Sequence, residues 1–196
     1  MRGFSLNMQK KEFYAHGKLL LTGEYAVLDG ALSLALPTQY GQRMEVCALE
    51  QKKIYFRSLT MEGETWFKEE LFTGSTEPVA LTLEKILREA QRLQPHFLSE
   101  EGAMVTTRLE FPQGWGLGSS STLIAMIAQW AKVDPYQLLW NSFGGSGYDI
   151  ACATASSPIL YQLEQGHAKS YPIYYQPDFT ESLFFVYLNQ KQNSRE

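Results

Sequence analysis

The chain has 196 residues, of which 44% are hydrophobic and 19% are charged, and this composition excludes a disordered or collagen-like protein. Its formal net charge of −4 excludes the strongly basic surface with which many proteins bind nucleic acids or anionic membranes. A chain of this length can bury a full hydrophobic core, so we expect one domain or one large lobe.

Cysteine and histidine usage indicates a reducing compartment and argues against a zinc site. Cys47 and Cys152 form no CxxC pair, and the three histidines lack the spacing of metal ligands. The N-terminal segment carries charges in place of the apolar core of a secretory signal. The longest apolar stretch, 123–131, is about half of a membrane span. We therefore expect a cytoplasmic protein with reduced thiols that binds neither nucleic acid nor membrane.

The first part of the chain has the pattern of β-structure. This pattern runs from Glu12 to about Phe72, and turn signals at Asp29-Gly30, Gly41 and Glu62-Gly63 divide it. The strands expected there span 31–36, 43–49, 53–59 and 65–67.

Helices and strands mix in the remainder of the chain. Apolar residues from Val79 to Leu93 recur at helical spacing with charges between them, which predicts a helix that ends before Pro95. Residues 105–111 alternate as in a strand. Asp134-Pro135 reads as an N-cap followed by proline at the first helical position. The other expected elements are helices over 123–132, 134–140 and 150–155 and strands near 158–163 and 182–188. The sequence therefore predicts an α+β fold.

Two glycine-rich loops carry the strongest functional signal. Six of the 15 glycines lie between Gly114 and Gly147, in loops that each precede a helix. In Gly114-Trp-Gly-Leu-Gly-Ser-Ser-Ser-Thr122, glycines let backbone amides approach a ligand, and hydroxyls follow at the helix N-terminus. Both features favour an anion, most naturally a phosphate, and a serine there can also ligate Mg²⁺. A tight strand-to-helix turn without any ligand is the simpler alternative.

Three common loop motifs do not fit these residues. A Walker A loop needs Gly-Lys-Ser/Thr, and no lysine lies between Gly114 and Thr122. The dinucleotide fingerprint GxGxxG would need glycine at Ser119. Neither loop contains the GxSxG nucleophile elbow.

Three segments, in the right order, resemble the GHMP kinases, a family that includes galactokinase, homoserine kinase, mevalonate kinase and phosphomevalonate kinase. Residues 112–122 resemble the family's atypical phosphate loop, residues 15–30 its N-terminal motif, and Gly145-Ser-Gly-Tyr-Asp-Ile-Ala-Cys-Ala153 the segment with its catalytic aspartate. The similarity is closest to the mevalonate and phosphomevalonate kinase branch and to bacterial homologues with a Gly-Tyr-Asp-Ile-Ala run. The resemblance implies a two-lobed α+β fold whose N-terminal lobe resembles the ribosomal protein S5 domain 2-like fold.

The resemblance also implies a role for individual residues. Asp149 would face the acceptor hydroxyl as general base or charge stabiliser, and Lys18 would orient that hydroxyl or neutralise the transferring charge. Ser120 would help to hold Mg²⁺. The ATP phosphates would be bound by Gly114, Gly116, Leu117, Gly118, Ser119, Ser120 and Ser121. The acceptor would be bound by Glu24, Tyr25, Gly147 and Tyr148. Phosphoryl transfer needs such groups on chemical grounds, because it depends on positioning and charge neutralisation. Taken singly, Lys18 could be a solvated charge and Asp149 a helix N-cap.

The chain departs from the family pattern at several positions. Tyr25 stands where histidine is usual, His16 where proline is usual, and Leu138 where mevalonate kinases often carry a magnesium-binding glutamate. These differences affect the acceptor and the metal ligands more than the reaction. Family members are longer and carry a C-terminal lobe. We therefore expect residues 1–196 to form the N-terminal, ATP-binding domain, with that lobe absent from this chain.

The sequence thus predicts a kinase that uses ATP and Mg²⁺ to phosphorylate a hydroxyl or phosphate of a small metabolite, with mevalonate or phosphomevalonate as the first choice. The alternatives are an ATP-dependent decarboxylase of the diphosphomevalonate type, a non-catalytic nucleotide-binding protein and, last, a nicotinamide-dependent enzyme. A homodimer is left open.

Overall fold

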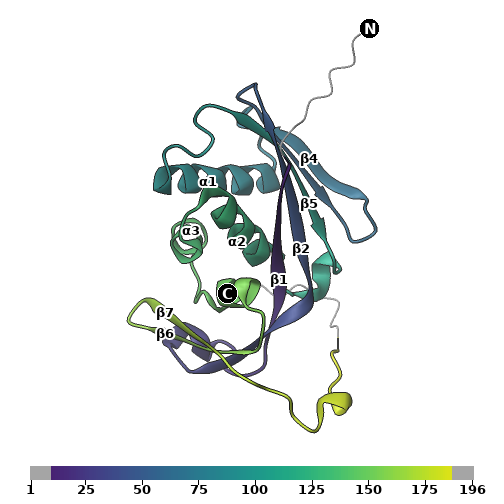
Figure 1. Cartoon of the computed structure of the whole chain (residues 1–196), viewed down its shortest axis with the longest axis vertical. Coiled ribbons are helices and arrows are strands. Elements are labelled where there is room, and N and C mark those ends of the chain that lie inside the picture. The colour runs from purple at the N-terminus through teal and green to yellow at the C-terminus, as the bar shows by residue number, and fades with distance from the viewer. Residues whose placement is uncertain (1–9, 187–196) are drawn as a thin grey trace.

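A seven-stranded mixed sheet forms the centre of residues 10–186, the part of the chain that this computed structural model describes (Figure 1). The strand order is β4-β3-β5-β2-β6-β7, and β1 pairs with the other edge of β2. The β3–β5 pair is parallel and the other pairs are antiparallel. The strands are β1 (Lys10–Leu20), β2 (Ser33–Leu49), β3 (Ile54–Leu59), β4 (Thr65–Leu71), β5 (Gly102–Leu109), β6 (Ile159–Glu164) and β7 (His167–Pro172).

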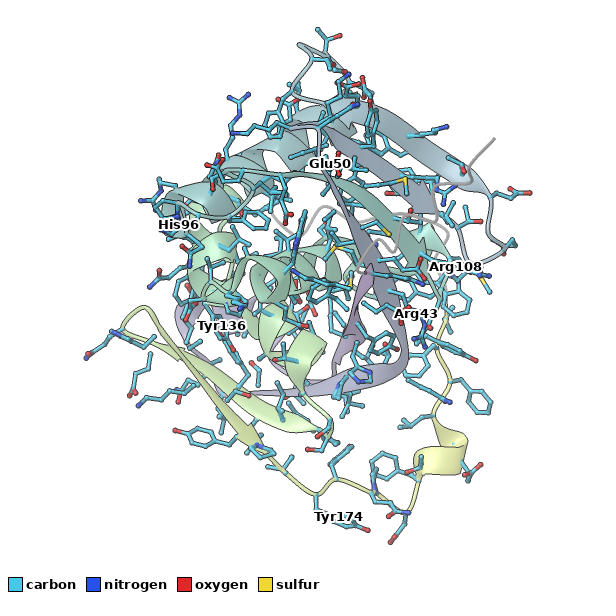
Figure 2. The ribbon with its side chains drawn as sticks, turned by 45° about the horizontal axis from the view of Figure 1, so that its top comes forward. Arg43, Glu50, His96, Arg108, Tyr136 and Tyr174 are labelled. Atoms are coloured by element: carbon cyan, nitrogen blue, oxygen red, sulfur yellow. The ribbon has the colours of Figure 1, made fainter. Side chains whose placement is uncertain are left out.

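Helices cover one face of this sheet and bury its apolar side chains (Figure 1). Met44 and Val46 of β2 and Val105 of β5 point into that core. Arg43 and Arg108 come from the alternate positions of the same strands and are exposed (Figure 2). The helices are α1 (Pro78–Leu93), α2 (Ser119–Ala131), α3 (Pro135–Ser142) and α4 (Tyr148–Thr154). None of the helices within residues 10–186 has the length and apolar character to cross a bilayer.

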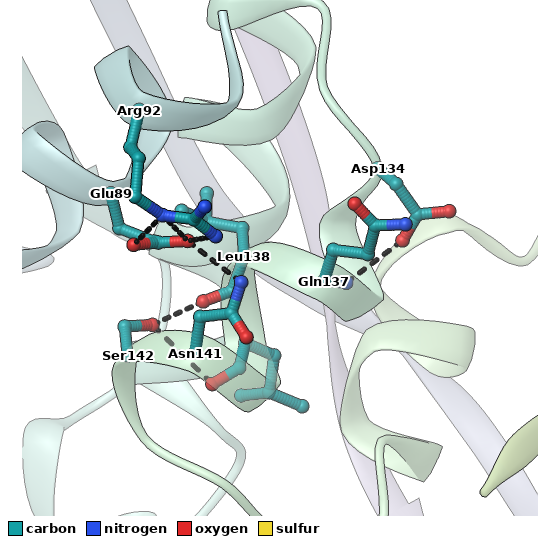
Figure 3. Close-up of polar contacts among 8 residues, drawn as sticks. Glu89, Arg92, Asp134, Gln137, Leu138, Asn141 and Ser142 are labelled. Carbon is teal, nitrogen blue, oxygen red and sulfur yellow. Dashed lines mark hydrogen bonds and ion pairs between the residues drawn. The ribbon is translucent and has the colours of Figure 1, made fainter.

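The predicted helix starts are confirmed where a carboxylate caps them. The Asp134 carboxylate accepts the Gln137 amide at 2.9 Å, directly before the proline that begins α3 (Figure 3). Glu77 caps α1 in the same way, because it accepts the Ala80 amide at 2.8 Å. Such caps satisfy backbone N–H groups that have no partner within the helix.

The turn predicted at Gly41 is wrong, because β2 runs unbroken from Ser33 to Leu49. Gly41 is a point of close approach within the strand, where a Cβ would overlap the backbone oxygen of Ala15 in β1. The missing side chain is needed for packing against β1, and Gly41 borders the irregular part of the β1–β2 pairing.

The strand predicted near 182–188 is absent from residues 182–186, the part of this range that the structure describes. Residues 180–182 form a 3-10 turn and residues 183–186 have no regular structure, while 187 and 188 lie outside the described residues. Instead, β7 follows β6 through a tight hairpin in which Gln165 and Gly166 have positive φ angles of 50° and 78°. The exposed strand β7 lacks an apolar alternation, so its sequence gave no strand signal.

Candidate functional site

The first glycine-rich loop joins β5 to α2 and leaves the start of that helix open. It begins with the 3-10 turn Gln113–Trp115, which includes Gly114. Gly116 and Gly118 have positive φ angles of 70° and 86°, which glycine adopts without steric cost. Gly118 is the N-cap of α2, and no side chain of the described residues caps this end. The positively polarised amides of the first turn are therefore available to an anion.

The hydroxyl residues at this helix start form an inner and an outer group. Ser121 and Thr122 are buried. The Thr122 hydroxyl lies 2.6 Å from Gln42 Oε1 and 2.9 Å from the Ser119 carbonyl oxygen, which anchors the loop on β2. Ser119 is half-buried and Ser120 is exposed, so these two serines lie on the side that a nucleotide could reach.

The β1–β2 pairing is irregular beside Lys18, where three residues of β2 (38–40) lie opposite the single β1 residue Gly17. The pairing of β1 with β2 shifts between His16 and Lys18, and such an irregularity re-aims the side chains that follow. The Lys18 amide donates to the Leu117 carbonyl at 3.0 Å. The aliphatic stem of Lys18 covers Gly118, where a Cβ would lie 3.0 Å from Lys18 Cγ. These contacts hold β1, the first glycine-rich loop and the Lys18 side chain in fixed positions relative to one another.

The second glycine-rich loop, residues 143–147, leads into α4 and places Asp149 in the first turn of that helix. Gly147 has a φ angle of 89° and is the N-cap. A Cβ at this position would lie 3.1 Å from atoms of both Tyr136 and Tyr161. Only glycine fits the conformation and the space, so the path into α4 is closely defined.

Aromatic side chains hold the carbonyl groups of the second loop. The Trp140 indole N–H donates to the Gly145 carbonyl at 3.2 Å, and the buried Tyr161 hydroxyl donates to the Ser146 carbonyl. The roles of Trp140 and Tyr161 were not predicted, because an aromatic residue that donates a hydrogen bond to a loop has the same sequence pattern as one that only fills a core.

Lys18, Ser121 and Asp149 meet between the two loops. The Ser121 hydroxyl donates to Asp149 Oδ2 at 3.1 Å, and Lys18 Nζ lies 3.7 Å from Asp149 Oδ1. Asp149 Oδ1 is buried and accepts no hydrogen bond within the described residues. The two carboxylate oxygens therefore differ. Oδ2 accepts a hydrogen bond from Ser121, whereas Oδ1 lies near the Lys18 ammonium and accepts no hydrogen bond from the described residues. The sequence predicted Lys18 and Asp149 for this site, but it did not predict the bond from Ser121.

Tyr148, which was predicted to bind the acceptor, lies beneath this group. Its side chain is buried, and its hydroxyl accepts a hydrogen bond from Lys18 Nζ at 2.7 Å. The ammonium also lies 5.1 Å from the centre of the Tyr148 ring. Burial, together with the charge of Asp149, raises the pKa of Tyr148 far above its usual range, so the phenol stays neutral.

Glu24 and Tyr25 lie at the edge of the same region. Both are exposed, and they precede the 3-10 turn Ala26–Asp29. Glu24 also contributes to the raised pKa of Tyr148, which places its charge on this side of the molecule. Tyr25 has a φ angle of 60°, unusual for a residue with a side chain. Their predicted role in acceptor binding stays a prediction.

A separate groove lies between α1 and α3 and is lined by charged side chains. Glu89 accepts hydrogen bonds from Arg92 and from Asn141, each at 2.7 Å (Figure 3). Arg88 pairs with the buried Glu84 at 3.3 Å. These four charges are paired within the protein, and Lys85 also lines the groove, which follows the contact between α1 and α3.

The residues around the loops offer few ligands for a metal ion. Leu138, at the position of the glutamate found in mevalonate kinases, is fully buried in the core. Among residues 10–186, no group of three or more His, Cys, Asp or Glu could hold a metal. Ser120, the predicted Mg²⁺ ligand, is exposed at the start of α2, and its role as a ligand stays a prediction.

Comparisons with known proteins point to one fold. No family model and no curated protein matches the sequence. Mevalonate kinase from L. major, solved in complex with R-mevalonate, matches over 85% of this chain and 53% of its own length, with 16% identity and a TM-score of 0.58. Heptose 1-phosphate kinase from Bacteroides thetaiotaomicron matches over 85% of this chain and 60% of its own, with 14% identity and a TM-score of 0.63. The chain has the fold of the GHMP kinases.

A third GHMP kinase, Streptococcus pneumoniae phosphomevalonate kinase in complex with phosphomevalonate and AMPPNP, matches over 78% of this chain and 49% of its own length, with 21% identity and a TM-score of 0.57. The chain thus spans between about half and three fifths of these solved structures. The predicted α+β class and the predicted GHMP fold are confirmed.

Proposed function

We propose that this protein is an ATP-dependent kinase of the GHMP type, which transfers the γ-phosphoryl group of ATP to a hydroxyl or phosphate group of a small metabolite. The observation that carries this proposal is the meeting of Lys18, Ser121 and Asp149 beside the open N-terminus of α2. The GHMP fold supports it, and residues 1–196 would correspond to the N-terminal, ATP-binding domain of such a kinase.

The first loop would bind the nucleotide phosphates. Amides at the start of α2 and the exposed hydroxyl of Ser120 would contact phosphate oxygens, and the positive end of the helix would favour their charge. Lys18 would neutralise the charge on the phosphoryl group during transfer, which is the main requirement of this chemistry. Mg²⁺ bound to the phosphates would supply further neutralisation.

Asp149 would act on the acceptor. A hydroxyl bonded to the Asp149 carboxylate would give its proton to that carboxylate as its oxygen forms a bond to the γ-phosphorus and ADP leaves. The hydrogen bond from Ser121 to Oδ2 fixes the carboxylate for this step. With a phosphate acceptor, no proton has to move, and Asp149 would orient the group together with Lys18.

Mevalonate and phosphomevalonate are the acceptors that we propose first. Two of the solved structures with this fold hold these two compounds. Glu24, Tyr25 and Gly147 would line the acceptor side, and Tyr25 in place of the usual histidine would adjust its selectivity. A cytoplasmic location is also part of the proposal, and a homodimer is compatible with it.

The experiment is ADP release by the full gene product with Mg-ATP and mevalonate, phosphomevalonate, homoserine or galactose offered separately. We expect release with one acceptor and at least a hundredfold loss of kcat in Asp149→Asn, because a proton acceptor and a charge are removed (general base catalysis alone contributes about 10² to 10⁴). Asp178→Asn is the matched control, since Asp178 is an exposed carboxylate outside the site.

Each other outcome points elsewhere. Release of CO₂ when diphosphomevalonate is offered as a fifth compound would favour the decarboxylase. ATP binding without turnover by any acceptor would favour a non-catalytic nucleotide-binding protein. Binding of NAD without ATP would contradict the proposal.

A further inference from the structure

Tyr148 is the nearest polar partner of the Lys18 ammonium. The hydroxyl of Tyr148 lies 2.7 Å from Lys18 Nζ, whereas Asp149 Oδ1 lies 3.7 Å from it. The second distance is longer than an ammonium–carboxylate hydrogen bond of about 2.8 Å. Tyr148 and Asp149 are neighbours in α4 and both lie near the Lys18 ammonium, but only the neutral Tyr148 hydroxyl is within hydrogen-bond distance of it.

The chemical difference between the two partners matters for the cation. A phenol that accepts a hydrogen bond orients an ammonium without cancelling its charge. A carboxylate in direct contact would cancel much of that charge in a partly buried site, and one lone pair of its oxygen would be used by the ammonium. In the present geometry the Lys18 ammonium is not in direct hydrogen-bond contact with the carboxylate, and the buried Asp149 Oδ1 has no hydrogen-bond partner among the described residues.

We infer that Tyr148 is a positioning residue that holds Lys18 away from Asp149, so that the cation serves the phosphoryl group and the carboxylate serves the acceptor. This inference rests on the proposed function, and it assigns Tyr148 a role different from contact with the acceptor. The burial of Tyr148 beneath Lys18 supports the assignment, because its hydroxyl is already engaged within the protein.

Tyr148→Phe tests the inference, because it removes the hydroxyl and keeps the ring that packs in the core and lies under the ammonium. A crystal structure of the variant should show Lys18 Nζ about 2.8 Å from Asp149 Oδ1, as in a direct ion pair. A cation that stays near 3.7 Å would overturn the inference, whether or not the protein turns over ATP.

Kinetics provide the second readout. We expect kcat of Tyr148→Phe to fall about 10- to 100-fold, the range for loss of a hydrogen bond to a charged group, with the KM for ATP unchanged. In a Lys18→Met background, Tyr148→Phe should cause no further loss of kcat, because Tyr148 acts through Lys18. Additive losses in the double variant would contradict the inference.

Tyr136→Phe is the matched control. Tyr136, in α3, packs against Gly147 of the second glycine-rich loop, directly before Tyr148. The centre of its ring lies 5.6 Å from that of the Trp140 ring. Removal of its hydroxyl should leave kcat unchanged, and an equal loss in both variants would reassign the effect to general disturbance of the loop. A wild-type protein without turnover would contradict the proposed function, while the crystal structure of Tyr148→Phe would still decide the positioning role.

Discussion

At the scale of single residues, Gly118 is required both by its backbone conformation and by the space that the Lys18 side chain occupies. Its φ angle of 86° is left-handed, and the stem of Lys18 lies directly over it. Gly116, two residues earlier, has a similar φ angle of 70°, but a Cβ there would meet open space. Both glycines are needed for their backbone conformation, but only Gly118 is also needed to make room for the Lys18 side chain.

This pair gives a controlled prediction. Both Gly118→Ala and Gly116→Ala should cost about 1 to 2 kcal/mol of stability, since each forces a left-handed alanine. Gly118→Ala should lower kcat at least tenfold more than Gly116→Ala, because only the methyl group at position 118 would meet the Lys18 side chain and displace it. Thermal unfolding and ADP release of both variants would check this, and equal kinetic losses would argue against a special role of the Lys18 contact.

At the scale of elements, Glu110 ties together three strands of the sheet. It follows β5, and its Oε2 accepts the Tyr14 hydroxyl from β1 at 3.0 Å and the Gly41 amide from β2 at 3.1 Å. Its Oε1 accepts from Arg43 Nε at 2.8 Å. Burial alone would raise the pKa of Glu110, but these hydrogen bonds outweigh burial and hold its pKa below 4.5.

The lowered pKa of Glu110 predicts a loss of stability in acid. A carboxylate with a depressed folded-state pKa stabilises the fold above its unfolded pKa, and this contribution is lost as the pH falls through the folded value. Glu110→Gln should therefore lower Tm at pH 7 and narrow its gap to the wild type below pH 4.5. Thermal scans between neutral pH and pH 3 would measure this, and a gap that is constant with pH would show that Glu110 contributes no charge-dependent stability.

Local signals explain what the sequence predicted correctly. Asp134-Pro135 marks the start of α3 and the apolar spacing from Val79 marks α1, because caps and periodicity act within a few residues. Lys18 and Asp149 were predicted as site residues because their segments resemble two motifs of the GHMP kinases, and phosphoryl transfer needs a cation and a carboxylate.

Contacts distant in sequence explain what was missed. The bond from Ser121 to Asp149 and the hold of Tyr148 on Lys18 join residues from separate elements, and no local pattern encodes them. The turn signal of Gly41 was read wrongly for the same reason, since the crowding comes from Ala15 in another strand.

At the scale of the whole molecule, the segment after β7 runs along the outside of the described fold. Tyr174 lies away from the helices (Figure 2), and the side chains of Phe184, Phe185 and Val186 are 84%, 74% and 81% exposed. Apolar side chains this exposed contribute little to the core that the sheet and helices form.

Phe184→Ser combined with Phe185→Ser should therefore change the free energy of unfolding of the 196-residue chain by less than about 0.5 kcal/mol. Phe111→Ala, at a position only 1% exposed, is the contrasting control and should cost about 3 to 5 kcal/mol. Urea unfolding would measure both. A loss of more than 1 kcal/mol in the double variant would mean that this segment packs against the fold.

The long strand β2 also has a consequence for how the protein is made. Its first residues, Ser33 to Ala35, pair with Ile159 to Tyr161 of β6, and its later residues pair with β5. Pairings so distant in sequence close slowly, because the chain between them loses entropy first. During synthesis, β2 therefore leaves the ribosome long before the partner of its first residues exists. Until β6 emerges, the first residues of β2 have one edge without a partner strand, and chaperones or early partners could act on this edge in the interval.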